Sequence, residues 1–395
     1  MAPQMRERRL EVWAVAALSA GAAIMHMQGA QGAQAVSHES HRRVPFSGRD
    51  ELRSGEDAGG VVKYPAESNG LPVVNVGALR SAMALGTNGS TLRIASTAAV
   101  KRALLDYGLL YIANTGMDVD RRAAALQGAT QAVFNAPPET TAGLVDSSLF
   151  PPRGLTPFES ESVARVLGIG NYSDHVAKYS MGNTPRNPNI WPEGDTGFQK
   201  AWETYHDEAI DVARDLLFLI ARVLDLEDAA VWRPVLADTG ESILRHLRYP
   251  DVAPHRTSDA TANHRMPAHH DLDLITLIHQ TPAQNGFVSL QGQFGDPPEW
   301  VDVPAVPDTM VVTCGEVLTV ITGSQVTPAI HRVAAPSETL RIGSERSVTA
   351  MFYQPHGHVK IRPPDNTHFG VQPFPKEGLA FSEWQRFAFR NFRQG

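Results

Sequence analysis

The chain has 395 residues, a formal net charge of −7 and 42% hydrophobic residues, enough for one large globular domain or two smaller ones. It contains no long run of lysine and arginine, which argues against nucleic acid as a partner, because binding a phosphate backbone needs a basic patch. The single cysteine, Cys314, excludes an intrachain disulfide and a cysteine-based zinc site. Since Cys314 lies in an apolar run, we expect it to be a small buried hydrophobe.

The first segment, residues 1–35, is typical of a secretory signal or an organelle transit peptide. Three arginines precede an apolar stretch over 12–23, and the segment ends in the small-residue pattern Ala33-Gln34-Ala35. The stretch is shorter than the roughly 20 residues that span a bilayer, so we expect no stable membrane span in the mature protein. A functional leader would direct the protein to a plastid or the secretory pathway. If the leader is not functional, we expect the protein to be cytoplasmic. The alternative interpretation of residues 1–35 is a disordered extension with a chance apolar patch.

Residues 36–69 are polar and lack periodicity, which predicts a disordered linker outside the fold. An N-terminal region of helices and short strands then follows over 70–240. In chain order we expect a strand at 70–76, a helix at 94–107, a strand with a turn at 109–116, a helix at 120–134 and a long helix at about 196–226. Between the last two helices, residues 147–191 are rich in Gly, Pro, Asn and Ser and show weak periodicity.

From residue 242 onward the pattern changes to short strands, most of them rich in β-branched or aromatic residues and separated by Gly, Pro, Asn or Asp. The predicted strands lie at 243–250, 274–279, 287–290, 310–313, 317–321, 331–334 and 347–353. Many short strands with regular turns indicate a β-sandwich or barrel. We place this β-core at residues 241–356 and a C-terminal extension at 357–395.

A histidine and an aspartate two residues apart, His269 and Asp271, stand at one of these strands. On a strand, residues i and i+2 point to the same side, so an imidazole and a carboxylate can aim at one point. Adding His331 would complete the two-histidine, one-carboxylate set of non-haem Fe(II) oxygenases, which leaves coordination positions open. His270 is the rival ligand, but its i+2 partner is Leu272, which cannot bind a metal. Taken alone, each of the three would more often be an ordinary polar residue than a ligand.

Further motifs follow in a fixed order. They are Gly286-Phe-Val-Ser-Leu-Gln, Glu299-Trp-Val-Asp-Val-Pro, Thr313-Cys-Gly-Glu-Val-Leu and Ala329-Ile-His-Arg-Val. Together with the segments 71–76, 107–116 and 269–280, this series resembles the isopenicillin N synthase-like branch of the Fe(II)/2-oxoglutarate-dependent dioxygenases. The resemblance covers roughly residues 71–353, and the ordered series is more specific than the metal triplet.

The resemblance implies an α+β fold, with a double-stranded β-helix (jelly-roll) core and flanking α-helices. It implies Fe(II) on His269, Asp271 and His331, with 2-oxoglutarate and O₂ as cosubstrates and ascorbate as an optional reductant. Arg346 takes the position of an arginine that binds the distal carboxylate of 2-oxoglutarate. Tyr249 matches a tyrosine that hydrogen-bonds the cosubstrate or the substrate.

One position departs from the family pattern. The serine that stands two residues after the arginine in most members is replaced by Val348. Ser347 and Thr349 do not share a strand face with Arg346 if the register is regular. Because of Val348, an alternative function stays open, namely that of an oxidase that does not use 2-oxoglutarate. Leu247 is a second departure, because other members have Asn there.

The function implied by the resemblance is oxidation of a small molecule by hydroxylation, desaturation or ring closure, with release of succinate and CO₂. Basic residues near the β-core suit an amino-acid-like or carboxylate substrate of specialised metabolism. The candidate anion anchors are Arg186, Asn189, Arg245 and Arg248. Two alternatives are the oxidase just described and a metal-free binding protein on the same fold; the ordered motifs argue against a cupin-like or zinc-hydrolase site. We expect a monomer.

Overall fold

The computed structural model describes residues 67–78, 98–146, 148, 152–183, 187–226, 232, 235, 240–251, 264–363, 368–369, 372–373 and 377–388. The predicted leader, most of the predicted linker and the candidate anchor Arg186 lie outside these residues. At the end of the segment predicted as a linker, Glu67–Ser68 form strand β1, which pairs with strand β2 (Leu71–Asn75). No helix within the described ranges is long and apolar enough to cross a membrane.

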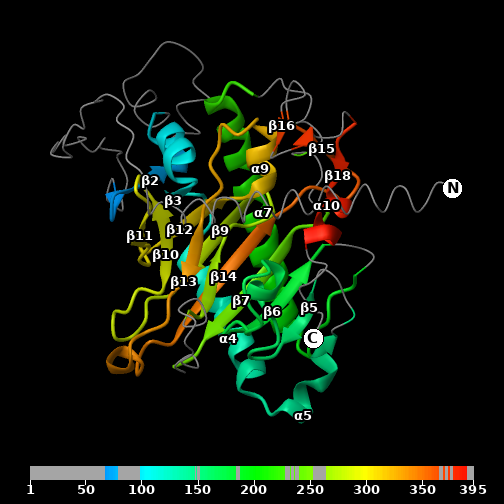
Figure 1. Ribbon diagram of the computed structural model, residues 1–395. Coiled ribbons are helices and arrows are strands. Elements are labelled where there is room, and N and C mark those ends of the chain that lie inside the picture. Colours follow the sequence, from blue (N-terminus) through cyan, green and yellow to red (C-terminus); the bar gives the residue numbers. More distant parts are fainter. Residues whose placement is uncertain are drawn as a thin grey trace.

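Two β-sheets occupy the centre of the molecule (Figure 1). Within the described residues the main sheet has ten strands, in the order β1, β2, β3 (Leu109–Ala113), β12 (Thr309–Cys314), β9 (Ile275–Gln280), β14 (Arg346–Tyr353), β7 (Ile243–Tyr249), β6 (Ala177–Gly182), β5 (Arg153–Thr156) and β4 (Val145–Asp146). The minor sheet has the order β11 (Glu299–Asp302), β10 (Leu290–Phe294), β13 (His331–Val333) and β8 (Met266–His269). In the main sheet β2 and β3 run parallel, and the pairs around them are antiparallel.

The helices and the small hairpins complete the described structure. They are η1 (Ala103–Tyr107), α4 (Val119–Asn135), α5 (Pro138–Thr141), η2 (Ala142–Leu144), α6 (Val163–Val166), α7 (Thr196–Val223), α9 (Glu316–Ile321), η4 (Glu338–Leu340) and α10 (Phe381–Ala388), with the strand pairs β15 (Lys360–Ile361) with β18 (Leu379–Ala380) and β16 (His368–Phe369) with β17 (Gln372–Pro373). The predicted helices at 120–134 and 196–226 are confirmed as α4 and α7. The predicted helix at 94–107 is described from residue 98 and ends in the π-helical turn η1.

The inner faces of the two sheets enclose one apolar cluster. Its members come from both sheets and include Tyr111, Leu247, Ile278, Leu290, Phe294, Val311, Val333 and Val348. This is the packing of a double-stranded β-helix, in which β7, β14, β9 and β12 face the four strands of the minor sheet. The predicted jelly-roll core with flanking helices is therefore confirmed.

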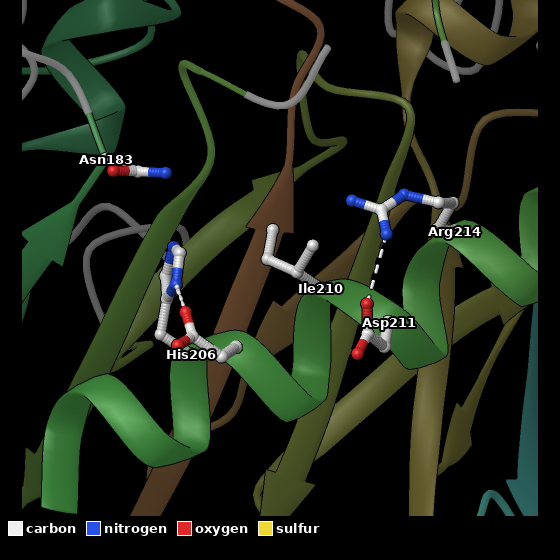
Figure 2. A pocket seen from close by; sticks show the side chains of 6 residues that line it. Asn183, His206, Ile210, Asp211 and Arg214 are labelled. Atoms are coloured by element: carbon white, nitrogen blue, oxygen red, sulfur yellow. Dashed lines mark hydrogen bonds and ion pairs between the residues drawn. The ribbon is translucent and has the colours of Figure 1, made fainter. Parts of the chain in front are cut away.

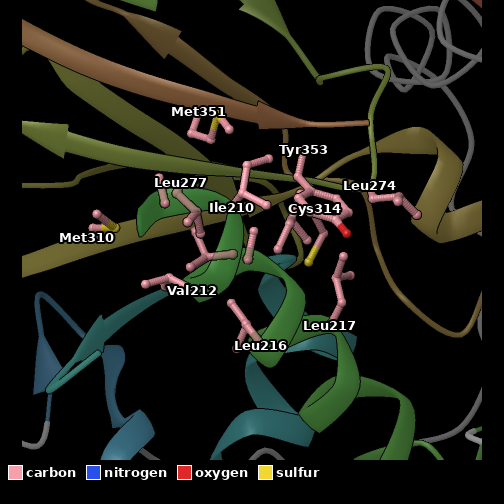
Figure 3. Packing of buried hydrophobic residues seen from close by; sticks show 14 of the residues in the cluster. Ile210, Val212, Leu216, Leu217, Leu274, Leu277, Met310, Cys314, Met351 and Tyr353 are labelled. Carbon is pink, nitrogen blue, oxygen red and sulfur yellow. The ribbon is translucent and has the colours of Figure 1, made fainter. Parts of the chain in front are cut away.

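Helices α4 and α7 cover the outer face of the main sheet. Because side chains alternate along a strand, residues such as Leu277 and Met351 point away from the minor sheet and meet the apolar side of α7. Figure 3 shows Leu216 and Leu217 of α7 packed beneath these strands. Each large side chain buried in this way contributes about 1.5–3 kcal/mol to folding. The outer face of the main sheet therefore stabilises the fold by packing against the helices, while side chains on the inner face lie between the two sheets.

One predicted strand is wrong. Residues 317–321 form helix α9 instead of a strand, and all six residues of Glu316–Ile321 are buried. A short apolar run that is buried on every side shows neither helical nor strand periodicity, so its pattern does not separate the two. The strand predicted at 287–290 is also displaced, since β10 begins at Leu290. Cys314 is buried and free, as expected.

Candidate active site

Two histidines face each other on neighbouring strands of the minor sheet. His269 is the last residue of β8 and His331 the first of β13, and the two are paired in register. Their ring centroids are 4.4 Å apart. Antiparallel pairing thus brings together two residues that are distant in the sequence.

Asp271 completes the group from the turn between β8 and β9. Its Oδ1 lies 3.9 Å from Nε2 of His269. Asp271 is not on a strand, so the turn, and not a shared strand face as predicted, directs its carboxylate. One ligand atom from each of His269, Asp271 and His331 lies within 4.8 Å of the others, and no second group of this kind occurs in the described residues. These three side chains can hold a metal ion.

Both imidazoles are oriented by main-chain carbonyls. Nδ1 of His269 lies 2.8 Å from the carbonyl oxygen of Pro267, and Nδ1 of His331 lies 3.0 Å from that of Ala329. If each Nδ1 donates its proton there, each Nε2 keeps a lone pair for a metal. Burial, together with the neighbouring His331, lowers the pKa of His269 to about 3. The neutral imidazole is the form that binds metals.

The carboxylate of Asp271 is buried and held by two hydroxyl groups. Thr276 Oγ1 donates to Asp271 Oδ2 at 2.6 Å, and Thr313 Oγ1 donates to the same oxygen at 3.1 Å. Burial opposes ionisation, but the facing His331 and His269 lower the pKa of Asp271 below its usual value. For the nearby Asp273, burial and the charge of Asp271 raise the pKa well above its usual value.

The rival ligand His270 is not part of this group. Its Nε2 lies 3.5 Å from Oε2 of Glu316, at the start of α9. Burial opposes protonation, but this carboxylate raises the pKa of His270. The side chain of His270 is therefore engaged by its own partner.

Arg346 and Tyr249 are register partners on β14 and β7. The guanidinium carbon of Arg346 lies 5.6 Å from the centroid of the Tyr249 ring. Arg346 is 5% exposed, and its Nη2 donates to Oε1 of Gln280 at 2.8 Å. Among the residues that the structure describes, its Nε has no hydrogen-bond partner. Burial lowers the pKa of Arg346 to about 10, which still leaves it charged at neutral pH. No carboxylate of the described residues forms an ion pair with it, so this buried cation can accept one from a ligand.

Val348 lies on the same face as Arg346, as the alternation predicts. It is 7% exposed and pairs in register with Leu247 and Gln280. Thr349 faces the opposite side, where its Oγ1 lies 3.0 Å from Nδ1 of His246. No neighbouring hydroxyl on β14 therefore replaces the missing serine.

A buried ionic cluster lies on the inner face of the main sheet, and the sequence did not reveal it. Lys178 Nζ lies 2.8 Å from Glu161 Oε2 and 3.4 Å from Asp174 Oδ2, and Arg245 Nη1 lies 3.2 Å from the same Glu161 oxygen. Burial raises the pKa of Asp174 to about 6, against the opposing effect of Lys178. Glu161 and Asp174 come from the region of weak periodicity, where no pattern points to a buried carboxylate.

Two other candidate anion anchors have structural partners. Arg248 lies on the outer face and donates to Glu345 at 3.0 Å and to Asn135 at 2.7 Å. Asn189 accepts a hydrogen bond from the main-chain nitrogen of Gly182 at 2.9 Å. Of the two candidate arginines that the structure describes, Arg245 lies on the inner face.

A separate pocket of about 260 Å³ lies along α7 and contains none of these residues (Figure 2). Four of its five polar side chains form two pairs: Arg214 with Asp211 at 3.1 Å, and His206 with Asp207 at 3.1 Å. The pocket therefore has no feature that connects it to the metal-binding group.

Comparison with known proteins agrees with this geometry. The profile of the 2OG-Fe(II) oxygenase superfamily matches residues 241–355. The chain is 34% identical over 247 residues to deacetoxycephalosporin C synthase of Amycolatopsis lactamdurans, covering 61% of this chain and 74% of the relative. It is 28% identical over 253 residues to an alpha-ketoglutarate dependent kainoid synthase of Pseudo-nitzschia multiseries, covering 63% of this chain and 66% of that relative.

Among solved structures, a Neurospora crassa protein in complex with alpha-KG and thymine has the same fold, with a TM-score of 0.65 and 21% identity over 81% of this chain and 96% of that one. The chain therefore belongs to the Fe(II)/2-oxoglutarate oxygenase superfamily, in its isopenicillin N synthase-like branch. It is a dioxygenase that acts on small molecules and depends on Fe(II), 2-oxoglutarate and O₂.

Proposed function

We propose that His269, Asp271 and His331 bind the Fe(II) and that Arg346 and Tyr249 bind the distal carboxylate of 2-oxoglutarate. The observation that carries the first part is the convergence of three ligand atoms, one from each residue, to within 4.8 Å of one another. The second part is supported by the buried, charged Arg346, whose Nε has no hydrogen-bond partner in the described part of the chain. Bound Fe(II), together with 2-oxoglutarate and O₂, supplies the oxidising power for attack on a C–H bond.

The protein contributes orientation and charge. Nε2 of Gln280 donates a hydrogen bond to the carbonyl oxygen of Val303 at 2.8 Å, which orients Oε1 to accept one from the Arg346 guanidinium. Burial raises the pKa of Tyr249 to about 12, so its hydroxyl keeps its proton and can donate to a carboxylate. The apolar cluster around these residues excludes water, which strengthens each of these interactions.

The proposed substrate is a small amino-acid-like or carboxylate compound of specialised metabolism, which is hydroxylated, desaturated or cyclised with release of succinate and CO₂. Arg245 supports this class, because it is a cation on the inner face of the sheet. Its Nη1 pairs with Glu161 at 3.2 Å, and its guanidinium carbon lies 5.9 Å from the ring centroid of Phe352. The names of two relatives, a deacetoxycephalosporin C synthase and a kainoid synthase, support a biosynthetic role.

The experiment that tests the cosubstrate and the metal uses the full chain, loaded anaerobically with Fe(II). Adding 2-oxoglutarate should produce the weak visible metal-to-ligand charge-transfer band. His269→Ala should abolish the band by removing a ligand, and Arg346→Ala should weaken it by removing the carboxylate partner.

Two other outcomes would each contradict a part of this proposal. If Fe(II) binds but 2-oxoglutarate produces no band, the assignment of Arg346 and Tyr249 as partners of its distal carboxylate is wrong, and Val348 in place of the family's serine is the departure that explains it. If Fe(II) does not bind to the wild-type chain, the assignment of the three ligands is wrong.

A further inference from the structure

We propose that Thr276 and Thr313 are positioning residues that hold Asp271 as a one-oxygen ligand of the metal. This inference rests on the proposed ligand set. It adds two residues that do not contact the metal themselves and that act through the carboxylate.

The two threonines are direct cross-strand partners. Thr276 on β9 is paired in register with Thr313 on β12, and both side chains point to the inner face of the main sheet. Cross-strand partners bring their β-carbons to within about 5.5 Å of each other. The two hydroxyls therefore reach the same atom, Oδ2 of Asp271, at 2.6 and 3.1 Å.

These hydroxyls stand in a place where the sheet is otherwise apolar. The next inner-face residues along the two strands, Ile278 and Val311, belong to the apolar cluster between the sheets. Thr276 and Thr313 are 1% and 0% exposed, and a buried hydroxyl without a partner costs about 1–3 kcal/mol. Oδ2 of Asp271 is a partner of both hydroxyls, and Oδ2 of Asp273 lies 2.9 Å from Thr276 Oγ1 as a second partner of that hydroxyl. These carboxylates account for two buried polar side chains at this point.

The consequence for the carboxylate is that its two oxygens differ. Oδ2 already accepts two hydrogen bonds, which use the lone pairs that a metal would need. Oδ1 is the atom near Nε2 of His269. A carboxylate that bound through both oxygens would fill a coordination position that this class of site keeps open. The threonine pair therefore fixes which oxygen binds and leaves that position free.

The test measures metal binding instead of turnover, with Co(II) as the probe because its visible absorption reports the coordination number. We would titrate the full-length wild type, Thr276→Val, Thr313→Val and the double variant with Co(II). Valine keeps the shape of threonine and removes the hydroxyl. Loss of an outer-shell partner typically weakens metal binding by about 10–100-fold, so we expect this loss in the double variant and smaller losses in the singles.

Matched controls separate positioning from packing. Thr276→Ser and Thr313→Ser keep the hydroxyl and should restore Co(II) affinity and spectrum to near those of the wild type. Thr130→Val removes a buried hydroxyl of α4 that donates to the carbonyl oxygen of Leu126, and it should leave Co(II) binding unchanged.

The outcomes of this test are separable from those of the proposed function. If wild type binds no Co(II), or if His269→Ala binds it equally well, the ligand set fails. If wild type binds and His269→Ala does not, while both valine variants keep the wild-type affinity and spectrum, the ligand set stands and the positioning role is wrong. Circular dichroism would show whether the double variant folds; if it does not, the single variants and their serine counterparts decide.

Discussion

Val348 lies two residues after Arg346 on the inner face of β14 and offers no hydrogen-bonding group to a carboxylate there. Val348→Ser should therefore tighten binding of 2-oxoglutarate, because a hydrogen bond to a charged group contributes about 1.5 kcal/mol or more, which is roughly tenfold in Kd. Titration of the charge-transfer band gives the Kd. Val348→Ala changes the volume without adding a hydroxyl and should not tighten binding. Equal affinities for the serine and alanine variants would contradict the prediction.

The sequence could predict the proposed metal ligands better than the side chains that hold those ligands in place. His269 and Asp271 stand two residues apart, and this spacing marks them as a candidate pair, although the turn after β8, and not a shared strand face, brings them together. His331 lies on another strand and is the candidate that completes the set. Thr276 and Thr313 meet only because β9 and β12 pair in one register. Register is a long-range property that local patterns do not contain, so the hydroxyls on Asp271 could not be predicted.

At the scale of an element, α9 shows why some structure could not be read from local patterns. Its six residues are all buried, so the run resembles a core strand. The turn before β9 provides acceptors for the first main-chain nitrogens of α9, which favours a helix at this position. The nitrogen of Glu316 donates to the carbonyl oxygen of Asp271 at 2.8 Å, and the nitrogen of Val317 donates to the carbonyl oxygen of Asp273 at 3.0 Å. By contrast, α7 has a long amphipathic pattern and was predicted within a few residues.

The tight contact between α9 and this turn gives a second prediction. A Cβ on Gly315 would overlap the main-chain carbonyl of Asp273, so Gly315→Ala should lower the free energy of unfolding by about 2 kcal/mol or more and weaken Co(II) binding by moving Asp271. Gly128→Ala is the matched control, because it lies in α4 with no atom within 4 Å of the added carbon and should stabilise by about 1 kcal/mol. Urea unfolding of both variants checks this. A urea midpoint of Gly315→Ala equal to that of the wild type would contradict this prediction.

The packing of α4 on the main sheet gives a prediction about pH. His246 is buried on the outer face against Phe134, and burial, with the neighbouring His279, lowers the pKa of His246 to about 3. In the unfolded chain a histidine has a pKa of about 6.5. Between these values the unfolded state binds the extra proton, so stability should fall as pH drops below about 6.5, by up to about 1.4 kcal/mol per pH unit from this residue.

His246→Gln tests this contribution, because glutamine keeps a group that can bond to Thr349 Oγ1 and does not titrate. Urea unfolding at several pH values between 4.5 and 7 should show a shallower loss of stability in the variant than in the wild type. Parallel curves for the two proteins would exclude His246 as a source of the acid sensitivity.

At the scale of the whole molecule, the proposed metal site joins the two sheets. His269 and His331 belong to the minor sheet, while Asp271 lies in the turn that leads to the main sheet and is held there by Thr276 and Thr313. A bound metal therefore connects the two layers of the jelly roll, and a ligand that binds only the native state stabilises it by mass action.

This arrangement predicts that metal raises the melting temperature of the whole fold. Metal at about 100 times its Kd should add about 2.7 kcal/mol, which corresponds to a rise in Tm of several degrees. 2-Oxoglutarate should add a further rise in wild type and a smaller one in Arg346→Ala. Thermal unfolding with and without Co(II) measures these shifts. His331→Ala, which removes the ligand from β13 alone, should lose the metal-dependent rise; a full rise in that variant would mean that the metal does not connect the sheets at this site.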